Sequence, residues 1–309
     1  MMMKRTGILA VALMLLASSV AMGKPAKSHH VSHPVKKPVT KPVPKPVPPP
    51  VPPPPVVTPP PPPPSPPPVV TPPLLGPSGV LMPTGDIPGW HQVFSDNFTQ
   101  NVPLGSFPAA VASTWGNSYP DGWLDTSKAG TYMPSQVVSF QNGVMDLYLH
   151  TAGGVHMVAA PVPTLPTMTY GRYVIRFKSD SIPGYKTAWL LWPNSEVWPR
   201  DGEIDFPEGA LNDTIGGFVH YQGATSGSDQ YAMPNTGVAF TSWHTAMIDW
   251  LPTGVTFYLD GNVVGKTTSR VPNTPMHWVI QTETDGGAPP ASSAGHVQID
   301  WVTVYTPGA

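Results

Sequence analysis

Residues 201 to 209 read Asp201-Gly202-Glu203-Ile204-Asp205-Phe206-Pro207-Glu208-Gly209, and this stretch says most about how the 309-residue chain folds. It holds three carboxylates, Glu203, Asp205 and Glu208, within six residues, in a chain of which only 11% is charged. A solvated turn with acids chosen for solubility is one interpretation. The interleaved Ile204 and Phe206 favour a strand instead.

The spacing of the three acids predicts a β-bulge. Glu203 and Asp205 are two residues apart and share one face of a strand, whereas Glu208 would point to the opposite face of a regular strand. One extra residue at a bulge restores the parity and brings all three side chains to one face. Proline lacks a ladder donor and is tolerated in strands mainly at bulges and edges, and Pro207 lies where the bulge is needed.

Two carboxylates on one face are the groups that glycoside hydrolysis requires, one as nucleophile and one as proton donor. In a bulged strand the Cα atoms of Glu203 and Glu208 would be roughly 13 Å apart. Retaining enzymes hold their two carboxyl groups about 5–5.5 Å apart. We therefore expect the strand to lie on the concave face of a curved sheet, with both side chains leaning inward.

The segment from residue 86 onward predicts an all-β fold. All ten Trp lie in this part, and no window has sustained helical periodicity. Apolar alternation at 297–305 indicates a long strand, and Asn142-Gly143 and Asp260-Gly261 are strong hairpin signals. Many short strands with close turns favour a two-sheet antiparallel β-sandwich or jelly roll.

The first 23 residues predict a secretory signal and an exported protein, whether released, periplasmic or held at the cell surface. Lys4 and Arg5 form a positive region, residues 8–16 an apolar run, and Ala21-Met22-Gly23 a small-x-small cleavage site. The apolar run is shorter than the about 20 residues of a membrane-spanning helix. An uncleaved anchor is the alternative.

Residues 24–85 form a Pro-rich segment that predicts an extended polyproline II spacer before a folded domain at 86–309. The first 85 residues carry eight basic and no acidic side chains, whereas the rest carries eight basic against eighteen acidic ones, a net charge of −10. The basic tail could contact an anionic cell envelope, or its proline runs could bind a polyproline-recognising partner. The acidic domain argues against nucleic acid as a ligand, and the lack of Cys excludes disulfides and thiolate metal sites.

Three Trp residues precede the acidic cluster and predict a sugar subsite. Trp189, Trp192 and Trp198 share a stretch with several prolines, and indole faces stack on the C–H faces of sugar rings. Residues 189 and 192 point to opposite faces of a regular strand, so at most one of them can face a cleft.

Residues 198–208 resemble the active-site signature of glycoside hydrolase family 16 in its bulged Glu-x-Asp-x-x-Glu form, which laminarinase-like enzymes, agarases and carrageenases share. The likeness extends over about residues 90–307, including 170–176, 243–250 and 299–305. It implies a concanavalin A-like jelly roll and a secreted retaining endo-β-glycosidase, with β-1,3-glucan as the expected substrate. It also implies a monomer that binds polysaccharide and needs no cofactor. Some relatives hold a structural calcium. In this chain no acidic loop indicates such a site.

The resemblance assigns roles to individual residues. Glu203 becomes the nucleophile, Glu208 the general acid/base, and Asp205 an assisting carboxylate that modulates Glu203. Trp198 is implied as a stacking wall, Arg176 as a donor to sugar hydroxyls and His220 as a polar cleft residue. The other implied substrate contacts lie on neighbouring strands: Trp189, Gln281 and Glu283.

Alternatives remain for these assignments. Arg176 could pair with a surface acid, and His220 could be a core histidine. Phe206-Pro207 replaces the aliphatic-Met pair more frequent in the family, which leaves the substrate open. A carbohydrate-binding protein that does not cut is one alternative function. Another is a transglycosylase or depolymerase acting on the organism's own exopolysaccharide, because a sugar acceptor can intercept a covalent intermediate.

Overall fold

In the computed structural model, which describes residues 75–308, most of the regular structure is strand and forms two sheets. The larger sheet contains β1 (Trp90–Asp96), β2 (Gly130–Tyr132), β3 (Val138–Gln141), β4 (Val144–Ala152), β5 (Val155–Val158), β6 (Gly171–Ser179), β11 (His244–Leu251), β12 (Gly254–Leu259), β13 (Asn262–Thr267) and β15 (Gly295–Pro307). The smaller sheet contains β7 (Tyr185–Pro193), β8 (Glu203–Ala210), β9 (Gly216–His220), β10 (Gln230–Ala232) and β14 (Met276–Thr284). The helices are short: η1 (Ala109–Val111), α1 (Ala112–Trp115) and α2 (Pro134–Val137).

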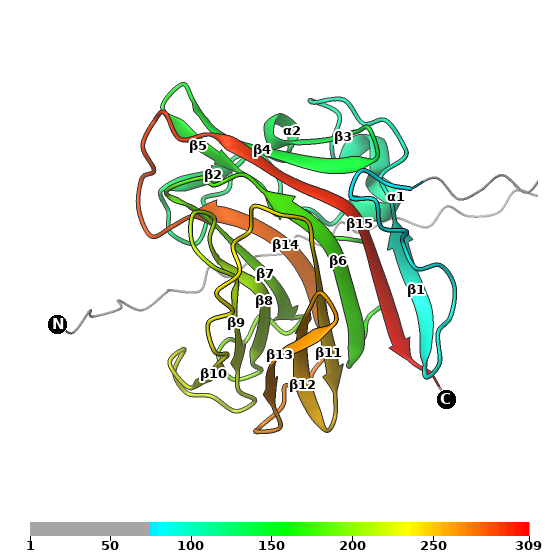
Figure 1. Ribbon diagram of the computed structural model, residues 1–309. Helices are drawn as coiled ribbons and strands as arrows, with labels where there is room; N and C mark the ends of the chain where they lie inside the picture. Colours follow the sequence, from blue (N-terminus) through cyan, green and yellow to red (C-terminus); the bar gives the residue numbers. More distant parts are fainter. Residues whose placement is uncertain (1–74, 309) are drawn as a thin grey trace, which may run out of the picture. The chain divides into compact units, whose positions relative to one another are not determined.

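The strand order is β13-β12-β11-β6-β15-β4-β5-β2 in the larger sheet, with β1 beside β15 and β3 beside β4. In the smaller sheet the order is β10-β9-β8-β7-β14, so β8 has a neighbour on each side. The strand pairs among the described residues are antiparallel except β2–β5. Figure 1 shows β6 and β15 in one layer and β7, β8 and β14 in the other. The predicted two-sheet antiparallel sandwich is confirmed.

The core lies between the two layers because alternate residues of each strand point inward. On β6, Tyr173, Ile175 and Phe177 are buried. On the facing β7, Trp189 is fully buried and meets Phe177 edge to face, with ring centroids 4.9 Å apart. Full burial of a side chain such as Phe177 stabilises the fold by about 1.5–3 kcal/mol, and the edge-to-face contact adds to this.

The two predicted hairpins have the backbone that their sequences favour. Asn142 and Gly143 join β3 to β4 with φ values of 55° and 75°. Asp260 and Gly261 join β12 to β13 with φ values of 50° and 81°. A two-residue type I′ turn needs a positive φ at both central positions, which Asn, Asp and Gly adopt most readily.

The chain before β1 already contacts the larger sheet. Ser78 donates its backbone N–H to Asp300 (3.1 Å), and the Trp301 indole donates to the Val80 carbonyl (3.1 Å). The predicted signal segment, and the Pro-rich spacer up to residue 74, lie outside the described residues. Between residues 75 and 308, no helix is long and apolar enough to cross a bilayer.

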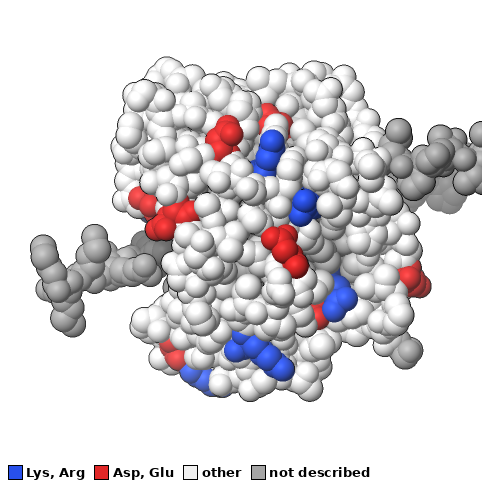
Figure 2. All heavy atoms as spheres, viewed as in Figure 1, with Lys and Arg blue, Asp and Glu red and all other residues white. Residues whose placement is uncertain are grey.

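Charged side chains are sparse on the face shown in Figure 2, where acids and bases are interspersed among uncharged residues. Independently of this view, several basic residues of the described chain are paired with acids. Arg172 contacts Asp249 at 2.6 Å, and Arg270 contacts Asp229 at 2.5 Å. The domain's negative charge is therefore not gathered into one patch on this face.

Candidate active site

The predicted bulge is present in β8. Across β9, Asp205 pairs with Phe218 and the next pair is Glu208 with Gly216, so three residues of β8 span two of β9. The register with β7 shifts over the same residues. Phe206, inside the bulge, is buried and stacks on Phe257 of the larger sheet at 4.9 Å. Alternation points Phe206 toward the core, and the bulge puts Glu208 on the other face of β8, together with Glu203 and Asp205.

Glu203, Asp205 and His220 form one end of the site. His220 Nε2 lies 3.6 Å from Glu203 Oε2 and 3.7 Å from Asp205 Oδ2. Strand register explains the contact, because Glu203 and His220 are directly opposite in the β8–β9 pair. Trp198 meets the His220 ring edge-on at 5.5 Å. Both Trp198 and His220 therefore lie beside the carboxylates, and their predicted contacts with substrate stay predictions.

The electrostatics favour a shared proton between Glu203 and Asp205. Burial, and then the charge of Glu208, raises the pKa of Glu203, while Asp205 and Trp198 lower it. Burial, and then the charges of Glu203 and Glu208, raises the pKa of Asp205 well above its usual value. A protonated Asp205 that donates a hydrogen bond to Glu203 relieves the repulsion between two buried carboxylates. Once Glu203 has lost its own proton, this arrangement holds the negative charge of the pair on Glu203.

Burial also affects the neighbouring histidine. It lowers the pKa of His220, which favours a neutral ring between the two acids. The Nδ1 atom of His220 and the Oδ2 atom of Asp205 are buried without a hydrogen-bond partner. Such polar atoms beside the carboxylates are suited to a hydroxylated ligand, because a buried polar group left unpaired is costly.

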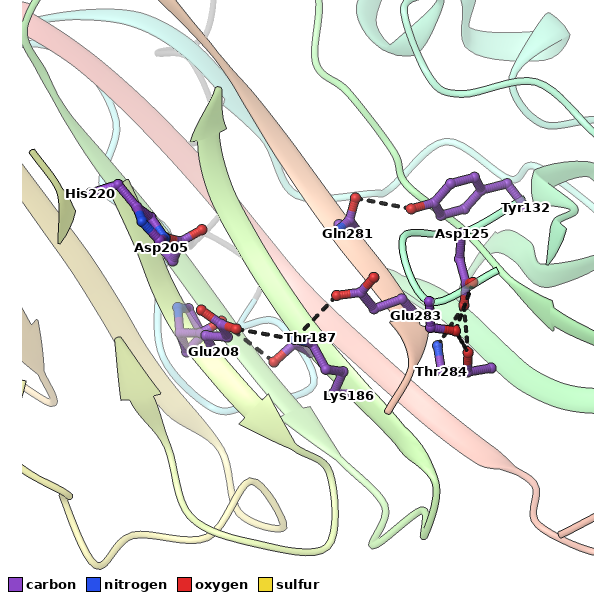
Figure 3. A network of polar contacts seen from close by, with 12 residues as sticks. Asp125, Tyr132, Lys186, Thr187, Asp205, Glu208, His220, Gln281, Glu283 and Thr284 are labelled. Atoms are coloured by element: carbon purple, nitrogen blue, oxygen red, sulfur yellow. Dashed lines mark hydrogen bonds and ion pairs between the residues drawn. The ribbon is translucent and has the colours of Figure 1, made fainter. Parts of the chain in front are cut away.

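Glu208 forms the other end of the site together with two residues from adjacent strands (Figure 3). Lys186 Nζ lies 3.1 Å from Glu208 Oε1 and 3.2 Å from Glu283 Oε1. Gln281 accepts a hydrogen bond from the Tyr132 hydroxyl at 2.9 Å. The β14–β7 register places Gln281 opposite Ala188 and Glu283 opposite Lys186. Gln281 and Glu283 therefore lie on the same face as Lys186, and their predicted contacts with substrate stay predictions.

Sequence reasoning missed Lys186 and Tyr132. A single lysine inside the apolar strand Tyr185–Pro193 was the available signal for Lys186, because a buried lysine needs an acidic partner. Tyr132 had no comparable signal, since its short strand reaches Gln281 only through the folding of the chain.

Trp189 does not join this site, which contradicts the predicted substrate contact. Trp189 is 0% exposed and belongs to the core between the sheets. Alternation along β7 instead puts Trp192 on the face of Lys186 and Ala188. Trp192 stacks against Trp198, with centroids 6.4 Å apart and planes at 16°. Of Trp189 and Trp192, of which at most one was expected on the face of the acids, it is Trp192 that lies there.

Arg176 also lies elsewhere, and the predicted hydroxyl donor is wrong for this residue. It belongs to β6 of the larger sheet, and its neighbour Phe177 points into the core. Alternation therefore turns Arg176 to the outer face. There its Nη1 atom donates to Thr245 (3.3 Å) and lies 3.7 Å from Asp260. This is the alternative interpretation of Arg176, a partner of a surface acid.

A cavity of about 340 Å³ lies beyond Trp192 and is lined by polar and apolar side chains that include Tyr119, Asn194 and His277. His277 is opposite Trp192 in the β14–β7 register. Burial, and then the charges of Glu196 and Glu203, raises the pKa of Tyr119 to about 12.

Among residues 75–308, one group has the spacing of metal ligands: the ligand atoms of Glu203, Asp205 and His220 lie within 4.8 Å of one another. These residues could coordinate a divalent cation through two carboxylates and one imidazole. Glu203 and Asp205 also have predicted catalytic roles, and His220 is a predicted substrate contact.

A family model and two β-glucanases match this chain in sequence. The family model of glycosyl hydrolases family 16 matches residues 126–303. A β-glucanase of Acetivibrio thermocellus is 30% identical over 148 residues, which are 47% of this chain and 43% of that protein. The chain thus spans less than half of that relative's length. A β-glucanase of Paenibacillus polymyxa is 26% identical over 200 residues, covering 63% of this chain and 80% of that protein.

Solved structures share the fold. The laminarinase from Rhodothermus marinus superimposes with a TM-score of 0.58 at 23% identity, over 71% of this chain and 98% of that one. A pseudo β-1,3-glucanase of Mycobacterium tuberculosis gives 0.58 at 20% identity, over 70% and 99%. Because the family model covers more than half of the sequence, the chain belongs to glycosyl hydrolases family 16.

Proposed function

We propose that this protein is an endo-acting β-glucanase that hydrolyses β-1,3-glucan with retention of anomeric configuration. The observation that carries the proposal is the bulge that brings Glu203, Asp205 and Glu208 to one face of β8. The family membership and the β-glucanases among the relatives support the substrate class. The aromatic pair Trp192 and Trp198 supports a sugar-binding wall beside the acids.

In the first step the protonated Glu208 gives its proton to the glycosidic oxygen while the Glu203 carboxylate attacks the anomeric carbon. The bond to the leaving sugar breaks, and an ester joins Glu203 to the remaining glycosyl group. In the second step Glu208 takes a proton from water, whose oxygen attacks the anomeric carbon and releases Glu203. A hydrogen bond from Asp205 to Glu203 keeps the nucleophile charged and oriented before the first step, and again once the second step has released it.

We also propose that the protein acts outside the cytoplasm as a monomer. The composition of residues 1–23 supports export. The basic, Pro-rich segment 24–85 supports a contact with an anionic cell envelope.

The test is the release of reducing ends from laminarin by the full chain and by Glu203→Gln, with mixed-linkage glucan, agarose and carrageenan in parallel. We expect laminarin to be cut by the wild type and activity to fall by at least about 10³-fold in the variant. Early products followed by proton NMR should have the β configuration.

Other results would point to other functions. Full activity in Glu203→Gln would contradict the nucleophile. Tight laminarin binding with unchanged chain length would indicate a carbohydrate-binding protein. Longer products with an added acceptor sugar would indicate transglycosylation.

A further inference from the structure

Lys186 connects the proposed acid/base to a second buried acid. Its ammonium lies 3.1 Å from Glu208 and 3.2 Å from Glu283, and the three residues come from β7, β8 and β14 (Figure 3). The side chains of Lys186, Glu208 and Glu283 are 23%, 18% and 5% exposed. Ala188, opposite both Glu208 and Gln281, carries only a methyl group, which leaves room for the lysine to reach Glu208.

This contact raises a chemical problem for a general acid. Glu208 must hold a proton when the glycosidic bond breaks, whereas a cation within 4 Å favours the carboxylate form. The conflict disappears if the cation has another carboxylate to neutralise it. Glu283 is that carboxylate, and its Oε2 atom is buried without a partner.

The protonation preferences of Lys186 and Glu283 fit a pair. Burial opposes the charge of Lys186, but Glu208 and Glu283 together raise its pKa above the usual lysine value. Burial raises the pKa of Glu283, and Lys186 acts in the opposite direction. A buried carboxylate next to a buried ammonium is therefore sustained by mutual charge compensation.

We propose that Lys186 and Glu283 are a positioning pair that sets when Glu208 holds its proton. Glu283 neutralises Lys186 while Glu208 is protonated, and Lys186 stabilises the Glu208 carboxylate that remains after proton donation. The same carboxylate is the base of the second step. The inference rests on the proposed hydrolysis at Glu208, and its test includes one measurement that needs no turnover.

Other charged groups near Glu208 do not provide this compensation. Glu203 and Asp205 on β8 are negative or neutral, and His220 on β9 contacts those two acids. The site has four acids: Glu203, Asp205, Glu208 and Glu283. Within residues 75–308, Lys186 is the only Lys or Arg that forms an ion pair with any of them. Further charged groups on nearby elements have partners of their own. Asp125 accepts a hydrogen bond from the Thr284 hydroxyl. On β11, His244 pairs with Asp260, and Asp249 pairs with Arg172.

The experiment measures the pH profile of kcat/KM on laminarin for Lys186→Met and Glu283→Gln. The alkaline limb of this profile reports loss of the Glu208 proton in the free enzyme. Without Lys186, Glu208 keeps its proton longer, and the limb should move up by roughly 1–2 pH units. Without the Glu283 charge, Lys186 is uncompensated, and the limb should move down by a similar amount.

The matched control is Lys178→Met, which removes a lysine stacked on Trp243 at 5.1 Å on the larger sheet. It should leave the limb in place. Shifts in the same direction for both cleft variants, or no shift in either, would overturn the proposal. Lys186→Gln repeats the measurement if circular dichroism shows that the Met variant is not folded.

A second readout separates this inference from the proposed function. Carbon-13 labelled glutamate NMR gives the Glu208 pKa directly, with the signal assigned by Glu208→Gln. We expect a higher pKa in Lys186→Met and a lower one in Glu283→Gln. A wild type that releases no sugar would refute the hydrolase while this titration still tests the pair. Unchanged titration in an active enzyme would refute the pair alone.

Discussion

Ala188 lies directly opposite Glu208 across β7 and β8, whereas the neighbouring pair joins Leu190 to Asp205. Between these two pairs β7 advances by two residues and β8 by three. The additional residue is the bulge at Phe206 and Pro207. It decides which way Glu208 points, because each single-residue change in register exchanges the two faces of a strand.

Deletions in the bulge can therefore test which face of β8 the Glu208 side chain must occupy for activity. Deleting Pro207 puts the second glutamate four positions after Glu203, which is again the cleft face of a regular strand. We expect the deletion variant to cut laminarin more slowly than wild type but faster than Glu208→Gln. Deleting Phe206 and Pro207 together puts the glutamate on the core face, and activity should vanish. A folded single-deletion variant as inactive as Glu208→Gln would contradict the parity argument.

Replacing the proposed nucleophile should stabilise the protein at high pH. The pKa of Glu203 is raised by burial and Glu208, so the folded state binds its proton more tightly than the unfolded chain. Its stabilising contribution is complete below the unfolded pKa, about 4.3, and is lost as pH rises through the folded value. Glu203→Gln cannot ionise and avoids this loss.

We expect Glu203→Gln to melt like wild type near pH 4. It should be more stable near pH 9 by on the order of 1–3 kcal/mol, since each pKa unit corresponds to about 1.4 kcal/mol. Thermal unfolding at both pH values measures the difference. Asp285→Asn, on an exposed loop, is the carboxyl-to-amide control and should show no such trend. A variant that loses stability with pH as steeply as wild type would refute the raised pKa.

Substitutions of Trp192 and Trp198 should weaken substrate binding, whereas substitution of Trp189 should lower stability. Trp192→Ala and Trp198→Ala remove the stacked wall, so KM for laminarin should rise several-fold, in line with about 0.5–1.5 kcal/mol per aromatic contact. Trp189→Phe should leave KM unchanged and lower the free energy of unfolding by on the order of 1–3 kcal/mol, because Trp189 packs in the core. Steady-state kinetics and denaturant unfolding distinguish the two. The reverse pattern would place Trp189 in the cleft.

Arg176→Met should not affect catalysis. Arg176 pairs with Asp260, whose side chain is 43% exposed, on the sheet that does not carry the acids. We expect kcat and KM within twofold of wild type and a stability loss of at most about 1 kcal/mol. A tenfold rise in KM would show that Arg176 does contact the substrate.

Much of the fold could be predicted because its signals are local. Asn142-Gly143 and Asp260-Gly261 adopt positive φ values at their own positions, so their hairpins depend little on distant residues. The face shared by Glu203, Asp205 and Glu208 follows from residue spacing and one proline. The predicted separation of about 5–5.5 Å between the two glutamate carboxyls stays a prediction.

The sequence alone determined the acidic strand, its bulge and the all-β class, since alternation and turn chemistry act over a few residues. Only the tertiary structure decided that Arg176 faces outward, that Trp192 and not Trp189 reaches the cleft, and that Lys186 joins Glu208 to Glu283. These outcomes depend on which strands become neighbours and which face of each meets the core. Contacts between strands distant in sequence set both, and no local pattern encodes them.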